Sequence, residues 1–395
     1  MDPHENPYTP GAGARPPALV GRDRQMEAFR ILLARLTRGR PEQSLLMTGL
    51  RGVGKTVLLA AFEQHARAHG WVTVDSEIRR DVAFGPRMAQ LVRRALLETA
   101  PRSRWRDAAR RAASVLRSFS LSVSTDGVLT GAIDVEPLVG VADSGDLSED
   151  LTDLLVALGE AARQHETGVV FLLDEVQFLA TEELEALLAA LHKIVQRELP
   201  IAIVGAGLPQ LPRLAGEAKS YAERLFRFLQ IGALGPGDAA EALTRPAEEL
   251  DVLFEPRAVE TVVTFTEGYP YFIQEYGKVL WDRADGSPIT AIEAVEAQAL
   301  VEVRLDESFF RVRIERASEL EVRYLRAMAE LGSDPQRAAE VAAVLARTTS
   351  QLGPVRSRLI EKGLLYQPSY GLAAFTVPQF DRFMRRSYPS PSTRR

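Results

Sequence analysis

The sequence predicts an α/β protein in which a buried parallel sheet precedes a helical region and a small C-terminal domain. Runs of consecutive apolar residues, such as 169–173, predict the sheet, because strands of a parallel sheet are buried on both faces. Segments with the period of amphipathic helices alternate with these runs, which is the order of β-α-β units. From residue 319 the pattern changes to three helical segments and two short strands, which indicates a separate domain.

The composition is that of a globular protein of ordinary charge. The chain has 395 residues, of which 46% are hydrophobic and 26% charged, and this length predicts two or three domains. The absence of cysteine excludes disulfides and cysteine-ligated metal sites. No apolar run approaches the ~20 residues that span a bilayer, so we expect no membrane contact and a cytoplasmic location. The formal net charge is −5, so binding of nucleic acid would need a local basic patch.

The segment GLRGVGKT, residues 49–56, fits the phosphate-binding pattern G-x-x-x-x-G-K-[ST]. Backbone N–H groups can surround a polyphosphate only where no side chains intrude, which explains the glycines. An apolar strand precedes the loop, and an amphipathic helix follows it with its N-terminus toward the anion. Lys55 is expected to reach the β- and γ-phosphates, and the Thr56 hydroxyl to ligate Mg²⁺. The expected nucleotide-binding residues of this segment are Gly49, Gly52, Val53, Gly54, Lys55, Thr56 and Val57.

A second, acidic site is expected directly after the apolar run 169–173. Asp174 and Glu175 follow this run, and ligands of open α/β sheets sit at the carboxyl ends of the strands. We expect Asp174 to hold Mg²⁺ through water and Glu175 to polarise the attacking water. The alternative is an ordinary strand that ends in a solvated acidic turn. With the loop, the acidic pair predicts the sheet core of a P-loop NTPase.

Several segments resemble the AAA+ and STAND ATPases, and most of all their initiator-like clade of origin-recognition and archaeal ATPases. The matching segments are VGRDRQMEAFRILL, GLRGVGKT, FLLDE, ERLFRFLQIGALGPGDAAEAL and EGYPYFIQEYG, which together cover about residues 18–290. The resemblance implies that the protein binds ATP or ADP with Mg²⁺ and hydrolyses ATP. It also implies a homo-oligomer that forms in the ATP state.

The resemblance implies roles for residues outside the loop as well. It places Val20, Gly21 and Arg22 near the adenine. Pro270 of the lid would contact the nucleotide. Arg224, which precedes the last core strand, would approach the γ-phosphate, often from a neighbouring subunit; the alternative is a surface arginine paired with a nearby glutamate. The expected catalytic residues are Glu175, Lys55 and Arg224.

The chain departs from motor-type AAA+ proteins in two places. No arginine lies between residues 267 and 277, the part of the lid in which such proteins carry one. The strand after the acidic pair ends in residues 205–207, Gly-Ala-Gly, without the polar side chain that senses the γ-phosphate. Both departures favour a slow switch, whose states differ in lid position, over a fast motor.

The C-terminal segment resembles a winged helix-turn-helix: three helices, then two strands joined by a turn, then a final helix. Arg358 and Lys362 are four residues apart on the third helix, so they lie on one face, where a recognition helix needs donors for DNA. Arg356 would lie on a flank or pack inward. These three residues are the candidate contacts to duplex DNA. The alternative is a domain that packs on the nucleotide lid or on a protein partner.

The domain boundaries follow from these patterns. We expect a disordered tail over 1–17, an ATPase core over 18–235 with an insert at about 100–147, a helical lid with a connecting helix over 236–318, a winged helix-turn-helix over 319–388 and a tail over 389–395. The insert contains a basic helix and a predicted β-hairpin, for which a DNA or partner contact is the alternative to a solvated decoration.

Three functions fit this organisation. The first is an ATP-dependent switch that acts on or near DNA through the winged helix. The second is a STAND-type signalling or scaffold ATPase, whose output is a protein partner. The third is a nucleotide-binding module with negligible turnover.

Overall fold

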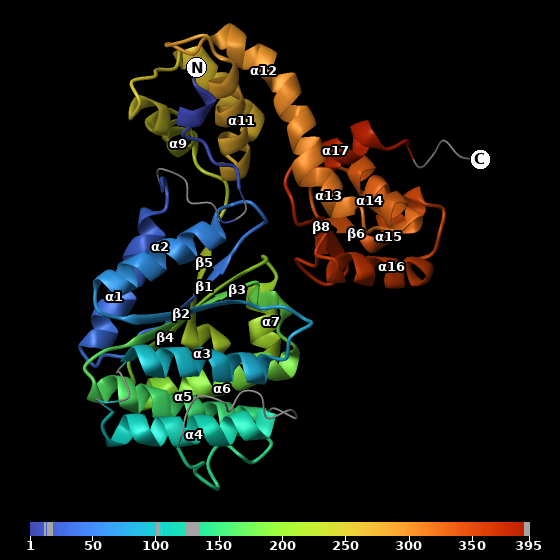
Figure 1. Cartoon of the computed structure of the whole chain (residues 1–395). Helices are drawn as coiled ribbons and strands as arrows, with labels where there is room; N and C mark the ends of the chain where they lie inside the picture. The colour runs from blue at the N-terminus through green and yellow to red at the C-terminus, as the bar shows by residue number, and fades with distance from the viewer. Residues whose placement is uncertain (12, 14–18, 100–102, 104, 124–134, 391–395) are drawn as a thin grey trace.

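The computed structural model describes residues 1–11, 13, 19–99, 103, 105–123 and 135–390. Figure 1 shows a sheet core, a helical lid beyond one end of the sheet, and a C-terminal domain that the long helix α12 joins to the lid. Within the described ranges, no helix combines the length and the apolarity that crossing a membrane requires.

The core is a sheet of five parallel strands in the order β2-β3-β4-β1-β5. The phosphate-loop strand β1 and the acidic strand β3 are therefore separated by β4 alone. Gly205 of β4 permits close packing there, because a Cβ at this position would lie 2.4 Å from Leu46 Cδ2. The strands are β1 (Ser44–Thr48), β2 (Val72–Glu77), β3 (Val169–Asp174), β4 (Ile201–Gly207) and β5 (Phe226–Gln230).

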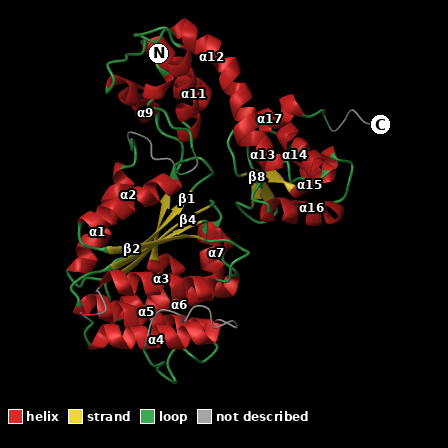
Figure 2. Ribbon diagram, viewed as in Figure 1, coloured by secondary structure: helices red, strands yellow, loops and turns green. Residues whose placement is uncertain are grey.

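Helices cover both faces of this sheet (Figure 2). Successive residues of β3 enter opposite cores: Val170 and Leu172 pack on the side of α1 and α2, whereas Phe171 and Leu173 pack on the side of α3–α6. This is the two-faced burial that the apolar run predicts. The core helices are α1 (Asp23–Thr37), α2 (Lys55–Ala68), α3 (Phe84–Thr99), α4 (Asp107–Val123), α5 (Leu147–Gln164), η4 (Val176–Phe178), α6 (Thr181–Gln196), α7 (Leu211–Ala218) and α8 (Ala222–Leu225).

The predicted insert contains helix α4, which packs its alanine-rich face on α3 and α5. Two of its arginines, Arg110 and Arg111, are exposed, whereas Arg117 is half-buried. The predicted hairpin falls on residues 124–134, which lie outside the described residues.

The lid consists of four helices, and a segment of π-helix carries its last helix toward the C-terminal domain. The connection is thus not one uniform helix. The elements are α9 (Pro236–Glu248), α10 (Pro256–Thr266), α11 (Pro270–Arg283), α12 (Ala291–Arg304), the π-helix η5 (Leu305–Arg311) and α13 (Val312–Ile314). Thr290 caps α12 with Glu293 in a reciprocal capping box.

The C-terminal domain has the predicted order of helices and strands, with one short strand added. Its three strands form an antiparallel sheet in the order β6-β8-β7. The elements are α14 (Glu319–Leu331), β6 (Gln336–Arg337), α15 (Ala338–Val344), α16 (Thr349–Glu361), β7 (Leu365–Tyr366), β8 (Leu372–Phe375) and α17 (Phe380–Ser387).

The N-terminal segment, residues 1–11, packs on the lid, although its composition predicts a disordered tail. After the short 3-10 helix η1 (Pro3–Glu5), Tyr8 is buried and donates its hydroxyl hydrogen to the Leu243 carbonyl at 2.5 Å. Trp281 Nε1 donates to the Asp2 carbonyl at 2.8 Å. The expectation was wrong for this segment because composition does not record a tertiary docking site: Gly277 in α11 leaves the space that the Tyr8 ring fills.

We predict that Gly277→Ala destabilises the lid. An added Cβ would lie 2.5 Å from the Tyr8 ring, so the segment must shift, and overpacking of this kind costs about 1–3 kcal/mol. The melting temperature should fall in thermal unfolding. Gly353→Ala in α16 is the matched control: nothing lies within 4 Å of its added Cβ, and the change should be neutral or stabilising by up to ~1 kcal/mol. Equal melting temperatures for Gly277→Ala and the parent would contradict the prediction.

Candidate functional site

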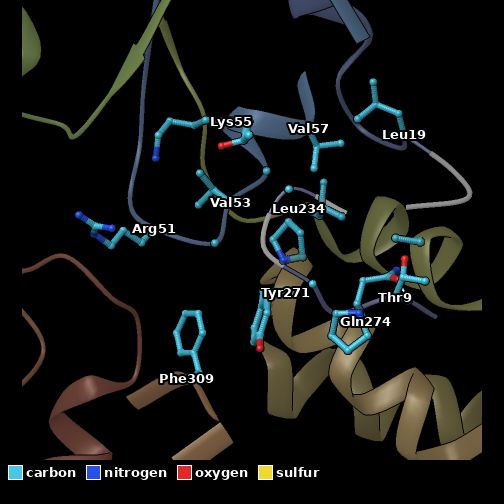
Figure 3. A pocket seen from close by; sticks show the side chains of 18 of the residues that line it. Thr9, Leu19, Arg51, Val53, Lys55, Val57, Leu234, Tyr271, Gln274 and Phe309 are labelled. Atoms are coloured by element: carbon cyan, nitrogen blue, oxygen red, sulfur yellow. Dashed lines mark hydrogen bonds between the residues drawn. The ribbon is translucent and has the colours of Figure 1, made fainter. Parts of the chain in front are cut away.

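A cavity of about 500 Å³ lies where the core, the lid and the connecting segment meet. Arg51 and Phe309 lie at one end, and Leu19, Thr9 and Gln274 at the other (Figure 3). Most of the predicted nucleotide residues line it. The lining residues include 51–57 of the loop, Val20 and Arg22, Asp174 and Glu175, Pro270, Tyr271 and Gln274 of the lid, Ser308, Phe309 and Arg313 of the connecting segment, and 9–11 and Gly13 of the N-terminal segment.

The loop has the backbone conformation that its glycines permit. Gly52 and Gly54 have φ of 84° and 91°, which is the left-handed region that favours glycine. Lys55 is buried and donates from Nζ to the carbonyls of Gly49 and Leu50, at 2.8 Å each. Burial lowers the pKa of Lys55 to about 8, although the charges of Glu175 and Asp174 oppose the shift. Gly49 does not line the cavity, but its carbonyl oxygen holds the lysine.

Thr56 and Asp174 lie together beside the loop. The Thr56 hydroxyl donates to Asp174 Oδ2 at 2.6 Å, so a hydroxyl and a carboxylate oxygen converge on one point. These are the ligand types that Mg²⁺ takes, and Mg²⁺ usually completes its shell with water and substrate phosphates. The described residues contain no group of three or more His, Asp or Glu side chains placed to hold a metal. The Thr56 hydroxyl and the Asp174 carboxylate fit a magnesium ion whose other ligands are water and phosphate oxygens.

Glu175 occupies a constrained position directly after the strand. It has φ of 55°, and strain of this kind is concentrated at functional sites. Its carboxylate forms an ion pair with Arg51 at 3.4 Å and a short hydrogen bond with the Gln177 side chain. In this conformation each carboxylate oxygen has a partner, Arg51 for one and Gln177 for the other.

The residues expected near the adenine are divided between two roles. Val20 lines the cavity. Arg22 Nη2 donates to the carbonyls of Val53 at 3.1 Å and Gly232 at 2.8 Å, so it supports the loop from behind. Gly21 lies outside the lining, and a Cβ there would lie 2.6 Å from the Asp238 carboxylate.

Arg224 is not part of the cavity lining. It lies on α8 with an exposed side chain, and its carbonyl accepts a hydrogen bond from Gln43. Within this chain it cannot replace the lid arginine that the sequence lacks. Neither Glu223 nor Glu217 forms an ion pair with it within the described parts of the chain, and Glu217 pairs with Arg213 instead.

Four sets of residues that line the cavity were not predicted from the sequence. The N-terminal segment carries no motif, so only its packing on the lid identifies it. Arg51 stands at a variable position of the loop pattern. Phe309 and Arg313 belong to a helical stretch whose periodicity predicts no ligand. Tyr271 and Gln274 fall within the matched lid segment, which was a signal for them.

The C-terminal domain contacts the loop directly. The Arg51 N–H donates to the Thr376 carbonyl at 3.0 Å, and a Cβ on Gly363 would lie 2.8 Å from Arg51 Nη2. The Gln367 N–H donates to Gln210 Oε1 of the core at 3.2 Å. Arg51 of the loop therefore connects the cavity to the C-terminal domain through both its backbone and its side chain.

The candidate DNA contacts bind a buried carboxylate inside their own domain. Glu321 is 1% exposed, and it pairs with Lys362 Nζ at 2.6 Å and Arg358 Nε at 3.1 Å. Arg356 donates to the Leu372 carbonyl at 2.6 Å. Arg358 and Lys362 keep 50% and 34% of their side-chain surface exposed, so both are partners of Glu321 and surface cations at once. Burial alone would raise the pKa of Glu321, but hydrogen bonds from Lys362, Ser318 and Arg358 lower it to about 2.

We predict that Glu321 stabilises the domain at neutral pH and less so in acid. Because its pKa falls from an ordinary 4.5 to about 2 on folding, its contribution is complete above pH 4.5 and is lost as the pH falls toward 2. The contribution reaches about 3 kcal/mol by linkage. In urea unfolding, the free energy of unfolding of Glu321→Gln should be lower than that of the parent at pH 7, and the difference should be smaller at pH 3. Exposed Glu361→Gln is the control; a gap that does not depend on pH would refute the prediction.

Comparison with known proteins finds two family matches. Residues 18–204 match the AAA ATPase domain, and residues 307–384 match a domain of unknown function (DUF8462). The comparison with curated proteins finds no match.

Solved structures from archaea and bacteria are similar over nearly the whole chain. A Walker-type ATPase of Pyrococcus abyssi has a TM-score of 0.54 at 16% identity, over 94% of this chain and 97% of that one. The RuvB Holliday junction branch migration motor of Thermotoga maritima has a TM-score of 0.46 at 17% identity, over 96% of this chain and 100% of that one. The Orc1 protein of Aeropyrum pernix, in complex with DNA, has a TM-score of 0.45 at 16% identity, over 94% of each chain.

These comparisons agree with the geometry of the cavity. The AAA ATPase match spans both the loop and the acidic pair, and the similarity to the Walker-type ATPase shows a common fold. Together they support an AAA+ P-loop ATPase.

Proposed function

We propose that this protein is a switch ATPase that binds ATP with Mg²⁺ and hydrolyses it slowly. The observation that carries the proposal is the convergence of Lys55, Thr56, Asp174 and Glu175 on one cavity. The cavity volume of about 500 Å³ lies in the range of small-molecule sites.

Each of these side chains has a chemical task in the proposed reaction. Lys55 exchanges its two carbonyl partners for phosphate oxygens, which favours its charged form. Thr56 and Asp174 hold Mg²⁺, which neutralises charge on the phosphates. Glu175 is held by an ion pair with Arg51 and a hydrogen bond from Gln177 until it turns to the attacking water. The loss of these contacts in that turn would slow turnover.

The lid, the N-terminal segment and the C-terminal domain would form the switch. Thr9 and Pro10 line the cavity, while the Thr9 N–H donates to Gln274 of the lid at 3.2 Å. The hydrogen bond between Arg51 and Thr376 connects the loop to the C-terminal domain. A nucleotide that moves the loop would therefore change how this domain docks. These contacts favour the STAND-type alternative, in which the output is a protein partner.

A second candidate output is duplex DNA. Its support is the order of elements from α14 to β8, which resembles a winged helix-turn-helix. Against it stand the pairing of Arg358 and Lys362 with Glu321 and the exposed remainder of α16, which is not basic. We also propose that Arg224, being exposed, acts only on the nucleotide of a neighbouring copy, in an oligomer that ATP promotes.

We expect two variants to separate binding from hydrolysis. Lys55→Ala should abolish tight ATP binding in isothermal titration, because the loop loses its point charge. Glu175→Gln should keep ATP and Mg²⁺ binding but lower turnover about 100-fold or more, the usual contribution of a general base. Phosphate release is the measurement, and exposed Glu182→Gln is the control. A Glu175→Gln variant with the parental rate would assign the base to another residue.

The output can be tested with fluorescence anisotropy on a DNA duplex at several salt concentrations. If Arg358 and Lys362 serve Glu321, replacing both by Ala should lower the melting temperature and leave the salt dependence of any binding unchanged. If they bind phosphates instead, the slope should fall by roughly 0.9 for each phosphate that is no longer neutralised. A fall of about 2 units, with unchanged nucleotide binding, would favour DNA over a protein partner.

A further inference from the structure

Among the described residues, four cations line the cavity: Arg22, Lys55, Arg51 and Arg313. Three of them have partners that belong to the expected site. Arg22 and Lys55 bind loop carbonyls, and Arg51 pairs with Glu175. Arg313 enters from α13, beyond the lid, and no motif accounts for it.

Arg313 is held over the loop by an aromatic stack. Its guanidinium lies 3.9 Å from the centroid of the Phe309 ring, and it donates a hydrogen bond to the Phe309 carbonyl. Phe309 stacks on Tyr271 with ring centroids 4.5 Å apart. Gly52 of the loop lies against this stack, since a Cβ there would be 3.5 Å from Phe309 Cζ and from Tyr271 Cβ. The stack thus fixes the arginine beside the phosphate-binding backbone.

The charge of Arg313 is not compensated within the described parts of the chain. No carboxylate there lies at ion-pair distance from it, and the two described acidic residues of the lining, Asp174 and Glu175, already bind Thr56, Arg51 and Gln177. Burial, then repulsion from Arg51, lowers the pKa of Arg313 to about 10, while Tyr271 opposes the shift. A half-buried cation without a counter-charge is costly, and an anion in the cavity would remove the cost.

We propose that Arg313 contacts the β- or γ-phosphate of the nucleotide bound in the same chain. This rests on the proposed ATP site. The contact assigns to the connecting segment the cation that the lid lacks between residues 267 and 277. Because α13 leads directly into the C-terminal domain, the same contact would transmit the phosphate state to that domain.

The test is nucleotide binding by the full-length protein, measured by isothermal titration with ATP, ADP and AMP in Mg²⁺. Arg313→Gln keeps hydrogen-bond donors but removes the charge. A charge-assisted hydrogen bond is worth enough to change affinity by about tenfold to a hundredfold, so ATP and ADP should bind that much more weakly. AMP should bind within about twofold of the parent. Arg313→Lys should recover part of the affinity, and exposed Arg311→Gln should have no effect.

The possible outcomes separate a phosphate contact of Arg313 from a structural role of this residue and from failure of the proposed ATP site. Binding of ATP and ADP by Arg313→Gln at parental strength, while Lys55→Ala fails to bind, would overturn this inference and leave the ATP site intact. Equal weakening of ATP, ADP and AMP, or a lowered melting temperature with no rescue by Lys, would show a structural role and overturn it too. A parent protein that binds no nucleotide would overturn the proposed function and this inference with it. Light scattering of the same samples completes the test. If Arg313→Gln lowers nucleotide affinity only in samples that are oligomeric, the contact within one chain is refuted.

Discussion

The structure depends on one close approach: the phosphate-binding loop meets the lid and the C-terminal domain at residues 51 and 52. Gly52 lies against Tyr269, Tyr271 and Phe309, with each ideal Cβ contact at 3.4–3.5 Å. Its φ of 84° lies in the left-handed region that favours glycine. Arg51 beside it binds Thr376 through its backbone and Glu175 through its side chain. The loop is therefore a joint between the parts of the molecule as well as an anion site.

The charges that line the cavity would make the contacts of the loop sensitive to a bound anion. Four cations of the described chain line the space, and burial lowers the pKa of three of them, Arg22, Lys55 and Arg313. A polyphosphate would relieve the desolvation costs of Lys55 and Arg313 and compete with Glu175 for Arg51. Since Arg51 also contacts the C-terminal domain, the proposed nucleotide binding would be linked to the docking of that domain. Such coupling suits a switch, because a ligand shifts only those equilibria in which it contacts the two states differently.

Much of the core and of the chemical site was predictable from the sequence. The buried strands followed from apolar runs, and the loop and acidic pair from residue types whose spacing is fixed by local backbone geometry. Thr56 and Asp174 lie 118 positions apart, yet their proximity could be expected because the carboxyl ends of parallel strands share one edge. The order of elements in the C-terminal domain was also local information, since caps and periodicity define it.

The remaining features depend on contacts that no local pattern encodes. Tyr8 is ordered because Gly277, far along the chain, leaves space for its ring. Arg313 reaches the cavity only because Phe309 stacks on Tyr271. The sequence predicts Arg358 and Lys362 as surface cations, and only the tertiary structure shows that both pair with the buried Glu321. The sequence by itself determined which segments form the sheet and where phosphate chemistry is expected. Only the tertiary structure decided which charges pair with one another, because pairing depends on distances between segments and on burial.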